Sequence, residues 1–254
     1  MAGRLEGKIA WVTGAGTGIG AATAERFAAE GATVVITGRR KEPLEAVAAR
    51  IAAAGGKAAV RPADLMKAEQ VKAVAEGIAR EHGRLDVLVS NAGLNVVERD
   101  WQRLSPAGID ELIGGNLTSA FYVAQAVLPI MRAQGGGVMI HTASMAGRNI
   151  GLMSGPGYVA AKHGVVAMSH TINQAECIHG IRSTAFCPGE VNTEILKKRP
   201  NPLSQQELDE MLQPADCADM ILYVATLPPH VTMNEVWLTP TKNRGYVRAL
   251  NVKL

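Results

Sequence analysis

Tyr158 and Lys162 stand four residues apart, a spacing that places two side chains on one face of a helix. A free tyrosine has a pKa of about 10, and a nearby ammonium group favours the phenolate and lowers that pKa. A phenol with such a neighbour can give or take a proton near neutral pH, as general acid–base catalysis requires. Ser144 follows an apolar run, where a strand would end and direct its hydroxyl to the same place. We interpret these three residues as the candidate catalytic group.

A tyrosine and a lysine at this spacing also occur by chance, so the pair needs support from other segments. A glycine-rich stretch, Thr13-Gly-Ala-Gly-Thr-Gly-Ile-Gly20, lies near the N-terminus, and Asn91-Ala-Gly93 follows an apolar run. Asn116 stands inside a long helical pattern, where glycine and asparagine are costly, and such a local cost suggests a functional site. With these segments in this order, the chain resembles the short-chain dehydrogenase/reductase family over essentially its whole length.

The resemblance implies an oxidoreductase that uses NADP or NAD and interconverts a small-molecule secondary alcohol and the corresponding ketone. Tyr158 is then the expected general acid–base residue, and Ser144 is expected to help it hold the carbonyl oxygen. Lys162 is expected to lower the pKa of the tyrosine and to bind the nicotinamide ribose. Asn116 is expected to hold a water that links Lys162 to solvent as a proton relay. The hydride chemistry itself belongs to the cofactor.

The glycine-rich stretch follows a short apolar run and opens an apolar-periodic helix, which is typical of a dinucleotide-binding loop. Glycines let the backbone approach a pyrophosphate, and the helix N-terminus supplies amide donors and the positive end of its dipole. Two registers fit. Gly16-x-Gly18-x-x-Ala21 matches the general dinucleotide pattern, and Gly14-x-x-x-Gly18-x-Gly20 matches the family that the chain resembles. We prefer the second, because Thr13 then ends the strand.

Three later segments complete the cofactor site that the resemblance implies. Asp64-Leu65 would face the adenine ring, although a helix N-cap before Lys67 is an alternative for Asp64. Asn91-Ala-Gly93 would admit the cofactor where the sheet topology reverses, with Asn91 bracing the sheet; a simple turn is the alternative. Pro188-Gly189 and the residues after it would flank the nicotinamide, and Thr193 would bond its carboxamide; a plain Pro-Gly turn is the alternative.

The end of the second expected strand bears on the choice between NADP and NAD. In dinucleotide folds an acidic residue about 20 positions after the glycine loop binds the ribose hydroxyl of NAD. Counting from Gly18 reaches Gly38, where no carboxylate stands, and Arg39 follows directly. Arg39 could form bidentate bonds to a 2′-phosphate, so NADP is the preferred prediction; a solvated loop arginine is the alternative. The expected cofactor-binding residues are Gly14, Thr17, Gly18, Ile19, Gly20, Arg39, Asp64, Leu65, Asn91, Ala92, Gly93, Tyr158, Lys162, Pro188, Gly189, Val191 and Thr193.

Short apolar runs alternate with helical patterns, which indicates a parallel sheet covered on both faces. The right-handed crossover rule favours an α/β fold: a Rossmann-type doubly wound parallel sheet of about seven strands with helices on both faces. We expect one catalytic domain over residues 1–254, with a polar substrate lid at about 190–213. The expected strands are 8–13, 32–37, 57–61, 85–90, 137–142, 181–186 and 236–239, and the expected helices are 18–30, 42–54, 67–81, 106–132 and 157–179.

Composition argues against several other classes of protein. The net charge of +3 is mild and charges of both signs are interspersed, so nucleic acid is not an expected partner. No apolar run reaches the length of a membrane span, and the N-terminus has no apolar signal core. The three cysteines form no Cys-x-x-Cys pair, which favours reduced thiols and a cytoplasmic location. The histidines show no metal-ligand spacing, so no metal is expected.

Assembly and substrate are predicted less directly. The helical stretches 106–132 and 157–179 carry more apolar surface than one sheet face would cover. In the family that the chain resembles, these helices pack across a dimer interface. We therefore expect a homo-oligomer, either a tetramer or a dimer. The sequence does not identify the alcohol or ketone. Two alternatives stay open: a 3-oxoacyl thioester reductase of fatty-acid synthesis, and a non-catalytic dinucleotide-binding regulatory protein.

Three features near the expected pocket bear on the substrate. The stretch 94–101, with Trp101, would line the pocket. Arg148, between Ser144 and Tyr158, would meet an anionic substrate, although an exposed loop arginine is the alternative. The ending from residue 233 departs from the glycine-rich ending of many family members and carries a basic tail at 242–248, so substrate identity cannot be transferred from better-known members.

Overall fold

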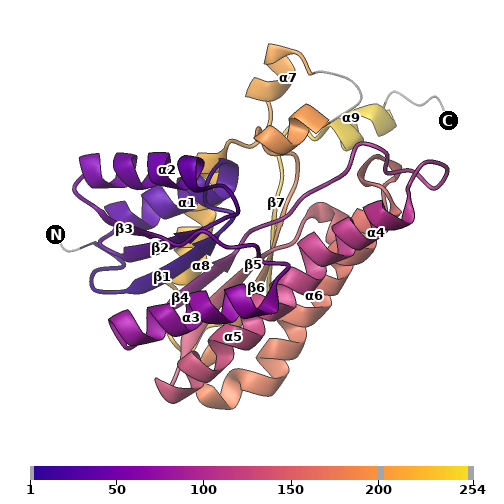
Figure 1. Ribbon diagram of the computed structural model, residues 1–254. Helices are drawn as coiled ribbons and strands as arrows, with labels where there is room; N and C mark the ends of the chain where they lie inside the picture. The colour runs from indigo at the N-terminus through magenta and orange to yellow at the C-terminus, as the bar shows by residue number, and fades with distance from the viewer. Residues whose placement is uncertain (1–2, 199–202, 251–254) are drawn as a thin grey trace.

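The computed structural model describes residues 3–198 and 203–250, which form a central sheet with helices on both sides (Figure 1). The strands are β1 Ile9–Thr13, β2 Thr33–Thr37, β3 Lys57–Val60, β4 Val87–Ser90, β5 Gly137–Thr142, β6 Ile181–Pro188 and β7 Glu235–Leu238. The helices are α1 Gly18–Ala29, α2 Lys41–Ala53, α3 Ala68–His82, α4 Pro106–Ile113, α5 Ser119–Ala133, α6 Pro156–Glu176, α7 Gln205–Asp209, α8 Pro214–Ala225 and α9 Arg244–Leu250.

The seven described strands run parallel in the order β3-β2-β1-β4-β5-β6-β7. Ala10 of β1 lies opposite Val34 of β2 on one side and opposite Val87 of β4 on the other. The chain therefore builds outward from β1 to β3 and then crosses back to β4, so the topology reverses between β1 and β4. The predicted fold, a doubly wound parallel sheet of about seven strands, is confirmed.

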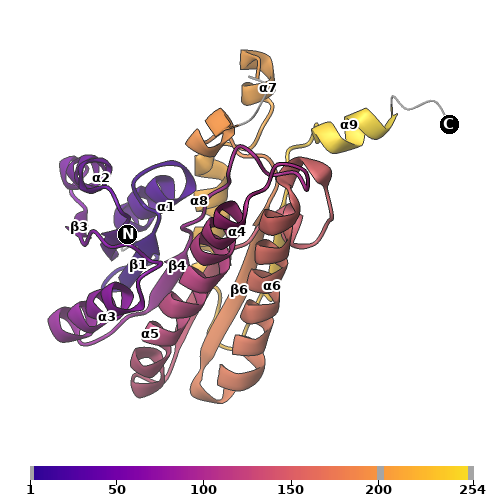
Figure 2. The same ribbon diagram turned by 45° about the vertical axis from the view of Figure 1, so that its right-hand side comes forward.

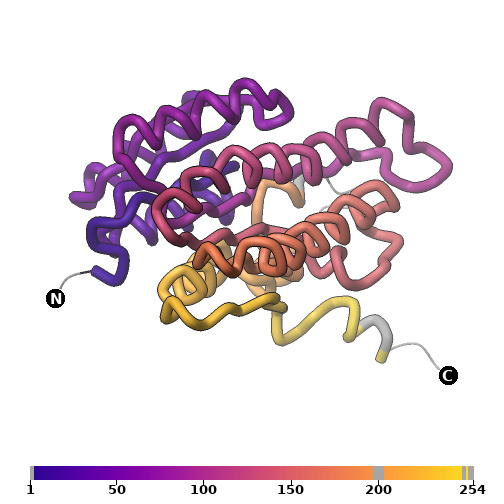
Figure 3. Tube along the Cα trace, turned by 90° about the horizontal axis from the view of Figure 1, so that it is seen from below, coloured from indigo at the N-terminus to yellow at the C-terminus, as the bar shows by residue number. Residues whose placement is uncertain are grey.

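Two apolar layers hold the helices against the sheet. One layer packs α1, α2 and α8 on one face, and its largest buried side chains include Phe27 and Phe186. The other packs α3, α5 and α6 on the opposite face, where Trp11 is fully buried and donates its indole N–H to the Thr37 hydroxyl at 2.9 Å. Figures 2 and 3 show α3, α5 and α6 running side by side along this face. No helix of the described residues is long and apolar enough to cross a membrane.

The expected strands agree with the structure to within two residues at each end, but the expected helices differ in two ways. The helix expected at 106–132 is α4 and α5 separated by one π-helical turn, Gly114–Thr118. The helices α7, α8 and α9 were not predicted. The start of α8 carries a helix signal in the sequence, with Pro214 in its first turn and a capping box between Gln213 and Asp216.

A buried histidine lies in the middle of the sheet. His141 of β5 stands between Ser90 of β4 and Ala185 of β6, is fully buried, and has no hydrogen-bond partner for either ring nitrogen among the described residues. Burial lowers its pKa to about 4, because the charged imidazolium loses its hydration there. The folded protein therefore holds His141 neutral well below the ordinary pKa of histidine.

This burial makes stability depend on pH. Above the unfolded pKa of about 6.5 both states hold a neutral His141 and stability is complete; between 6.5 and about 4 only the unfolded state takes up the proton, so stability falls as pH falls. The difference between these two pKa values corresponds to a loss of about 3 kcal/mol by pH 4. Urea unfolding from pH 7.5 to 4 would measure it. His141→Asn should lose this part of the pH dependence, and an unchanged slope in that variant would contradict the prediction.

Candidate functional site

A cleft of about 1000 Å³ lies at the carboxyl edge of the sheet, lined by the loops that follow the strands. It brings together most of the residues that the sequence singles out. Of the predicted set, only Gly20 and Asn116 do not line it; both lie directly behind its wall. The predicted residues that line it are Gly14, Thr17, Gly18, Ile19, Arg39, Asp64, Leu65, Asn91, Ala92, Gly93, Ser144, Tyr158, Lys162, Pro188, Gly189, Val191 and Thr193.

The glycine loop follows the register that we preferred. Gly14 and Gly18 have φ of 63° and 57°, a left-handed conformation that a side chain disfavours. A Cβ on Gly20 would stand 2.4 Å from the carbonyl oxygen of Gly14, so the start of α1 packs directly against the loop. Gly16 has no positive φ. The loop thus exposes backbone and the N-terminal end of α1 to the cleft, as an anionic diphosphate would need.

Asn91 joins the two strands between which the topology reverses. Its side-chain nitrogen donates to the Thr13 carbonyl oxygen at 3.2 Å, and its backbone N–H donates to the Thr13 hydroxyl at 2.9 Å. The backbone N–H of Ala92 donates to the same hydroxyl at 3.2 Å. These bonds fix the ends of β1 and β4 against each other, which supports the bracing role predicted for Asn91.

The candidate catalytic residues come from two adjacent elements. Ser144 follows β5 and caps a short 3-10 turn, accepting from the Ala146 N–H at 3.1 Å, and its hydroxyl lies close enough to Tyr158 to favour the phenolate and so lower the pKa of Tyr158. Tyr158 and Lys162 lie on the first turns of α6, which begins at Pro156 after Gly155 in a left-handed conformation. The Lys162 ammonium nitrogen is 5.6 Å from the centroid of the Tyr158 ring. The three side chains therefore meet at one wall of the cleft.

The electrostatics of this group differ from the sequence-based expectation. We predicted that Lys162 lowers the pKa of Tyr158, but burial raises that pKa, and the hydrogen bond with Ser144 opposes the rise only in part. Burial also lowers the pKa of Lys162 to about 8. The Lys162 nitrogen donates to the Thr142 carbonyl oxygen at 2.8 Å and lies over the face of the tyrosine ring. The loss of hydration therefore governs the pKa of Tyr158 in this arrangement.

Asn116 lies in the π turn behind the cleft and is buried. Its side-chain nitrogen donates to the carbonyl oxygens of Leu94 and Leu112, each at 2.9 Å, and its side-chain oxygen accepts from the Leu94 N–H at 3.1 Å. A Cβ on Gly93 would stand 2.9 Å from that oxygen and 3.3 Å from the Lys162 nitrogen. Asn116 thus fixes the loop after β4 beside Lys162, and π turns are frequent at functional sites.

The segment after β6 crosses the cleft beside the glycine loop. A Cβ on Gly18 would stand 3.0 Å from the Thr193 methyl group, so the two sides of the cleft approach closely there. Asp64 does not cap α3; its side chain accepts from the Met66 N–H at 3.0 Å, and Lys67 is the N-cap. Arg39 lies exposed on the rim, where it forms no hydrogen bond or ion pair with another described residue.

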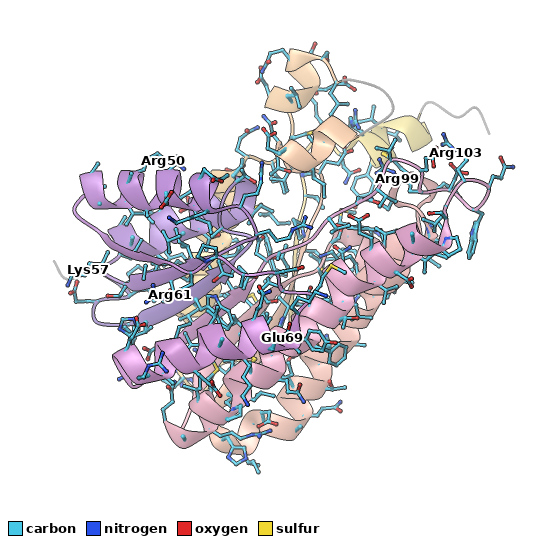
Figure 4. All side chains as sticks on the ribbon, in the orientation of Figure 1. Arg50, Lys57, Arg61, Glu69, Arg99 and Arg103 are labelled. Carbon is cyan, nitrogen blue, oxygen red and sulfur yellow. The ribbon has the colours of Figure 1, made fainter. Side chains whose placement is uncertain are left out.

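Two sequence-based expectations about the substrate end are wrong. Trp101 is 81% exposed and does not line the cleft, although Leu94, Asn95 and Arg99 of the same loop do. Figure 4 shows Arg99 and Arg103 on this loop, at the end of the molecule where α9 lies. Arg148 is bound by the Glu235 carboxylate, with its Nε at 2.7 Å, so it is not a free anion receptor.

Sequence reasoning missed one part of the cleft, the start of α9 and the residue before it. Asn243, Arg244 and Gly245 line the cleft. The only available signal was the departure of this ending from the family pattern. Among the described residues no group of three or more His, Cys, Asp or Glu side chains is placed to hold a metal ion.

Known proteins resemble the chain in sequence and in structure. The sequence pattern of the family described as "short chain dehydrogenase" matches residues 8–203. A 3-oxoacyl-[acyl-carrier-protein] reductase from Thermotoga maritima is 34% identical over 238 residues, which are 88% of this chain and 92% of the relative. A metagenomic short-chain oxidoreductase in complex with NADP has a TM-score of 0.82 at 34% identity, covering 94% of this chain and 99% of that one. A 7α-hydroxysteroid dehydrogenase complexed with NADH and 7-oxo glycochenodeoxycholic acid has a TM-score of 0.85 at 27% identity, covering 94% and 95%.

Proposed function

Because the chain belongs to the short-chain dehydrogenase family, we propose that this oxidoreductase interconverts a secondary alcohol and a ketone with a nicotinamide dinucleotide. One observation carries the proposal: Ser144, Tyr158 and the buried Lys162 line the same cleft as the glycine loop. The hydroxysteroid dehydrogenase that resembles the chain is complexed with a 7-oxo compound, which is a ketone. A ketone oxygen placed at these hydroxyls would stand beside the nicotinamide end of a bound dinucleotide.

The described residues fit such a cofactor. The left-handed Gly14 and Gly18 leave the backbone open at the start of α1, and a Cβ on Gly93 would fill the space beside Lys162. The loop residues and Asn91 would hold the diphosphate and the adjoining ribose, with Asp64-Leu65 at the adenine end. Val191 and Thr193, after Pro188-Gly189, would hold the carboxamide. When bound, the dinucleotide supplies or accepts the hydride.

The side chains of this chain would manage the proton and the developing charge. Ser144 and Tyr158 would hold the carbonyl oxygen by hydrogen bonds that strengthen as negative charge develops on it. Tyr158 would give its proton, and Asn116 would support the relay that returns one through Lys162. With a pKa of about 8, Lys162 can exchange a proton near neutral pH, which suits a relay group.

NADP is the preferred cofactor in this proposal. Arg39 has no partner among the described residues and lies on the cleft rim, which leaves its guanidinium available for a 2′-phosphate. The similar oxidoreductase in complex with NADP is consistent with this choice, whereas the hydroxysteroid dehydrogenase is complexed with NADH. The choice therefore rests on Arg39 and on the absence of a carboxylate at Gly38.

The alternative, a 3-oxoacyl thioester reductase, is supported by the relative from Thermotoga maritima and only weakly by the charges near the cleft. An acidic carrier protein would need accessible positive charge there. Arg39 and Arg40 are exposed on the cleft rim, whereas Arg244 is paired with the Glu190 carboxylate. A non-catalytic binding protein is less well supported still, because mere binding would not require the Ser144, Tyr158 and Lys162 arrangement.

Absorbance of the reduced nicotinamide would test the function directly. A panel of cyclic, linear and steroid ketones and a 3-oxoacyl thioester should be run with NADPH and NADH. We expect turnover of at least one simple ketone, faster with NADPH. Turnover of the thioester alone would favour the alternative, and no turnover of any compound with either cofactor would contradict the proposal.

We also propose that residues 1–254 act as one catalytic domain, with a substrate lid at about 190–213. The expected location of the protein is the cytoplasm. The lid segment forms a 3-10 turn at Glu194–Lys198 and the short helix α7, while residues 199–202 lie outside the described part of the chain. Opening and closing of this segment stays a prediction.

A homotetramer, or at least a dimer, is expected in solution. Phe121 of α5 is 49% exposed and Ile109 of α4 is 41% exposed, and a groove of about 420 Å³ between α3 and α5 is lined by Tyr122, Pro129 and Ile130. Such apolar surface is usually covered in symmetric assemblies. Light scattering at micromolar concentration would measure the mass, and a clean monomer would contradict the expectation.

A further inference from the structure

The C-terminal segment of the chain is joined to the cleft by one arginine. Arg244, the first residue of α9, donates from Nε and Nη2 to the two Glu190 carboxylate oxygens at 2.8 and 2.9 Å. Its third nitrogen, Nη1, donates to the Glu207 carboxylate at 2.6 Å. We call Arg244, Glu190 and Glu207 the C-terminal clamp. Figures 1 and 2 show α7 and α9, which carry Glu207 and Arg244, at the same end of the molecule.

Glu190 belongs to the segment that would flank the nicotinamide. It directly follows Pro188-Gly189, and its backbone carbonyl accepts from the Leu212 N–H at 3.1 Å. The Asn192 N–H donates to the Leu212 carbonyl at 2.8 Å. Residues 190–192 are therefore held by backbone bonds on one side and by Arg244 on the other, just before Thr193.

Glu207 belongs to α7, the short helix within the expected lid. It is the third residue of that helix and forms a capping box with Ser204, which holds its side chain at the helix start. A second ion pair, Lys242 with Glu210 at 2.7 Å, joins the same two segments. Arg244 thus bonds both to the inner segment of the lid and to its outer helix.

The geometry of the clamp distinguishes it from ordinary surface ion pairs. The side chains of Arg244 and Glu190 are only 19% and 24% exposed, and the bidentate arrangement fixes their mutual orientation. Lys242 and Glu210 are 66% and 35% exposed, and exposed single pairs contribute little. The clamp is therefore the contact that can hold the lid in one position.

We propose that Arg244 is a positioning residue: by binding Glu190 and Glu207 together, it holds the lid against the nicotinamide end of the cleft and forms part of the substrate wall. The proposal rests on the proposed function for its kinetic consequence, but not for the contact itself. The adenosine end of the cleft, with Arg39 and the glycine loop, lies outside the clamp. Loss of the clamp should therefore weaken substrate binding more than cofactor binding.

Steady-state kinetics would test the consequence. Arg244→Gln should raise KM for the ketone by about tenfold, as expected when a group that orients the substrate is loosened, while the Kd for NADPH rises by a smaller factor. Glu207→Gln, on the exposed side of α7, should give a smaller change of the same kind without risk to the fold. Arg50→Gln is the matched control, because Arg50 donates from two nitrogens to Glu25 on the outer surface at 2.9 and 2.7 Å.

Two further results separate a clamp from a general structural role. Glu190→Gln and Arg244→Gln should be non-additive, since each breaks the same contact. Amide hydrogen exchange of residues 203–213 in the cofactor-free protein should be faster in Arg244→Gln and unchanged in Arg50→Gln. Equal exchange in Arg244→Gln and the wild type would overturn the clamp, whether or not a ketone is reduced. Faster exchange in a protein that reduces no ketone would uphold the clamp and contradict the proposed function.

Discussion

Tyr158→Phe is expected to reduce turnover by about a hundredfold to ten-thousandfold, the usual effect of removing a general acid, while the cofactor still binds. The Tyr158 hydroxyl is the proton donor that the described structure places beside Ser144 and Lys162 on the cleft wall. Because its pKa is raised by burial, the hydroxyl stays protonated at neutral pH and is ready to donate. Initial rates on a reactive ketone and titration of NADPH fluorescence would measure the two effects separately.

Tyr122→Phe is the matched control for this experiment. Tyr122 lies on α5 and lines the groove between α3 and α5, outside the cleft. Its loss of a hydroxyl should leave the rate unchanged. A near-normal rate in Tyr158→Phe would show that the proton comes from another group, and loss of NADPH binding in that variant would point to a structural defect instead.

Arg39→Ala is expected to weaken NADP binding by about 1.5–3 kcal/mol, the contribution of a charged hydrogen bond, and to leave NAD binding almost unchanged. Arg39 has no other partner among the described residues, so its removal breaks no internal contact. Steady-state kinetics of the wild type and the variant with both cofactors would measure the difference. A wild type that prefers NAD, or an equal loss for both cofactors, would contradict the NADP assignment.

Gly38→Asp offers the converse control. A Cβ at this position would meet nothing closer than the Leu44 side chain at 3.7 Å, an ordinary contact, so the backbone should tolerate the change. The new carboxylate would repel a 2′-phosphate and accept from a ribose hydroxyl, which should shift the preference toward NAD.

The sequence predicted those site residues that lie in the loops directly after the strands. Gly14, Asn91, Ser144 and Pro188 come directly after apolar runs, and parallel strands bring their carboxyl ends to one edge, so local patterns were enough to gather them. The fold was predictable for the same reason, because the apolar runs of the strands are local patterns in the sequence. Substrate-side contacts depend instead on residues far apart in the sequence. Arg244 meets Glu190 and Glu207 only through the folded chain, and no spacing in the sequence indicates that pairing.

The pKa values show a second limit of sequence reasoning. The spacing of Tyr158 and Lys162 predicted that they lie close together, and they do. The spacing did not predict how far each side chain is buried. Lys162 is 3% exposed and Tyr158 is half-buried, and the loss of hydration shifts the pKa of each group. The same holds for His141, whose neighbours in β4 and β6 come from distant parts of the chain.

The π turn at Gly114–Thr118 also constrains how this part of the chain can change in length. Its hydrogen bonds span five residues where an α-helix spans four, so the stretch holds one residue more than a continuous helix would need. Each residue turns an α-helix by about 100°, so removing one here would merge α4 and α5 into a regular helix and rotate one against the other. Helical regularity would be regained, but Asn116 would no longer face Leu94. The number of residues is therefore constrained here in addition to their identity, because a deletion would move Asn116 away from the loop after β4.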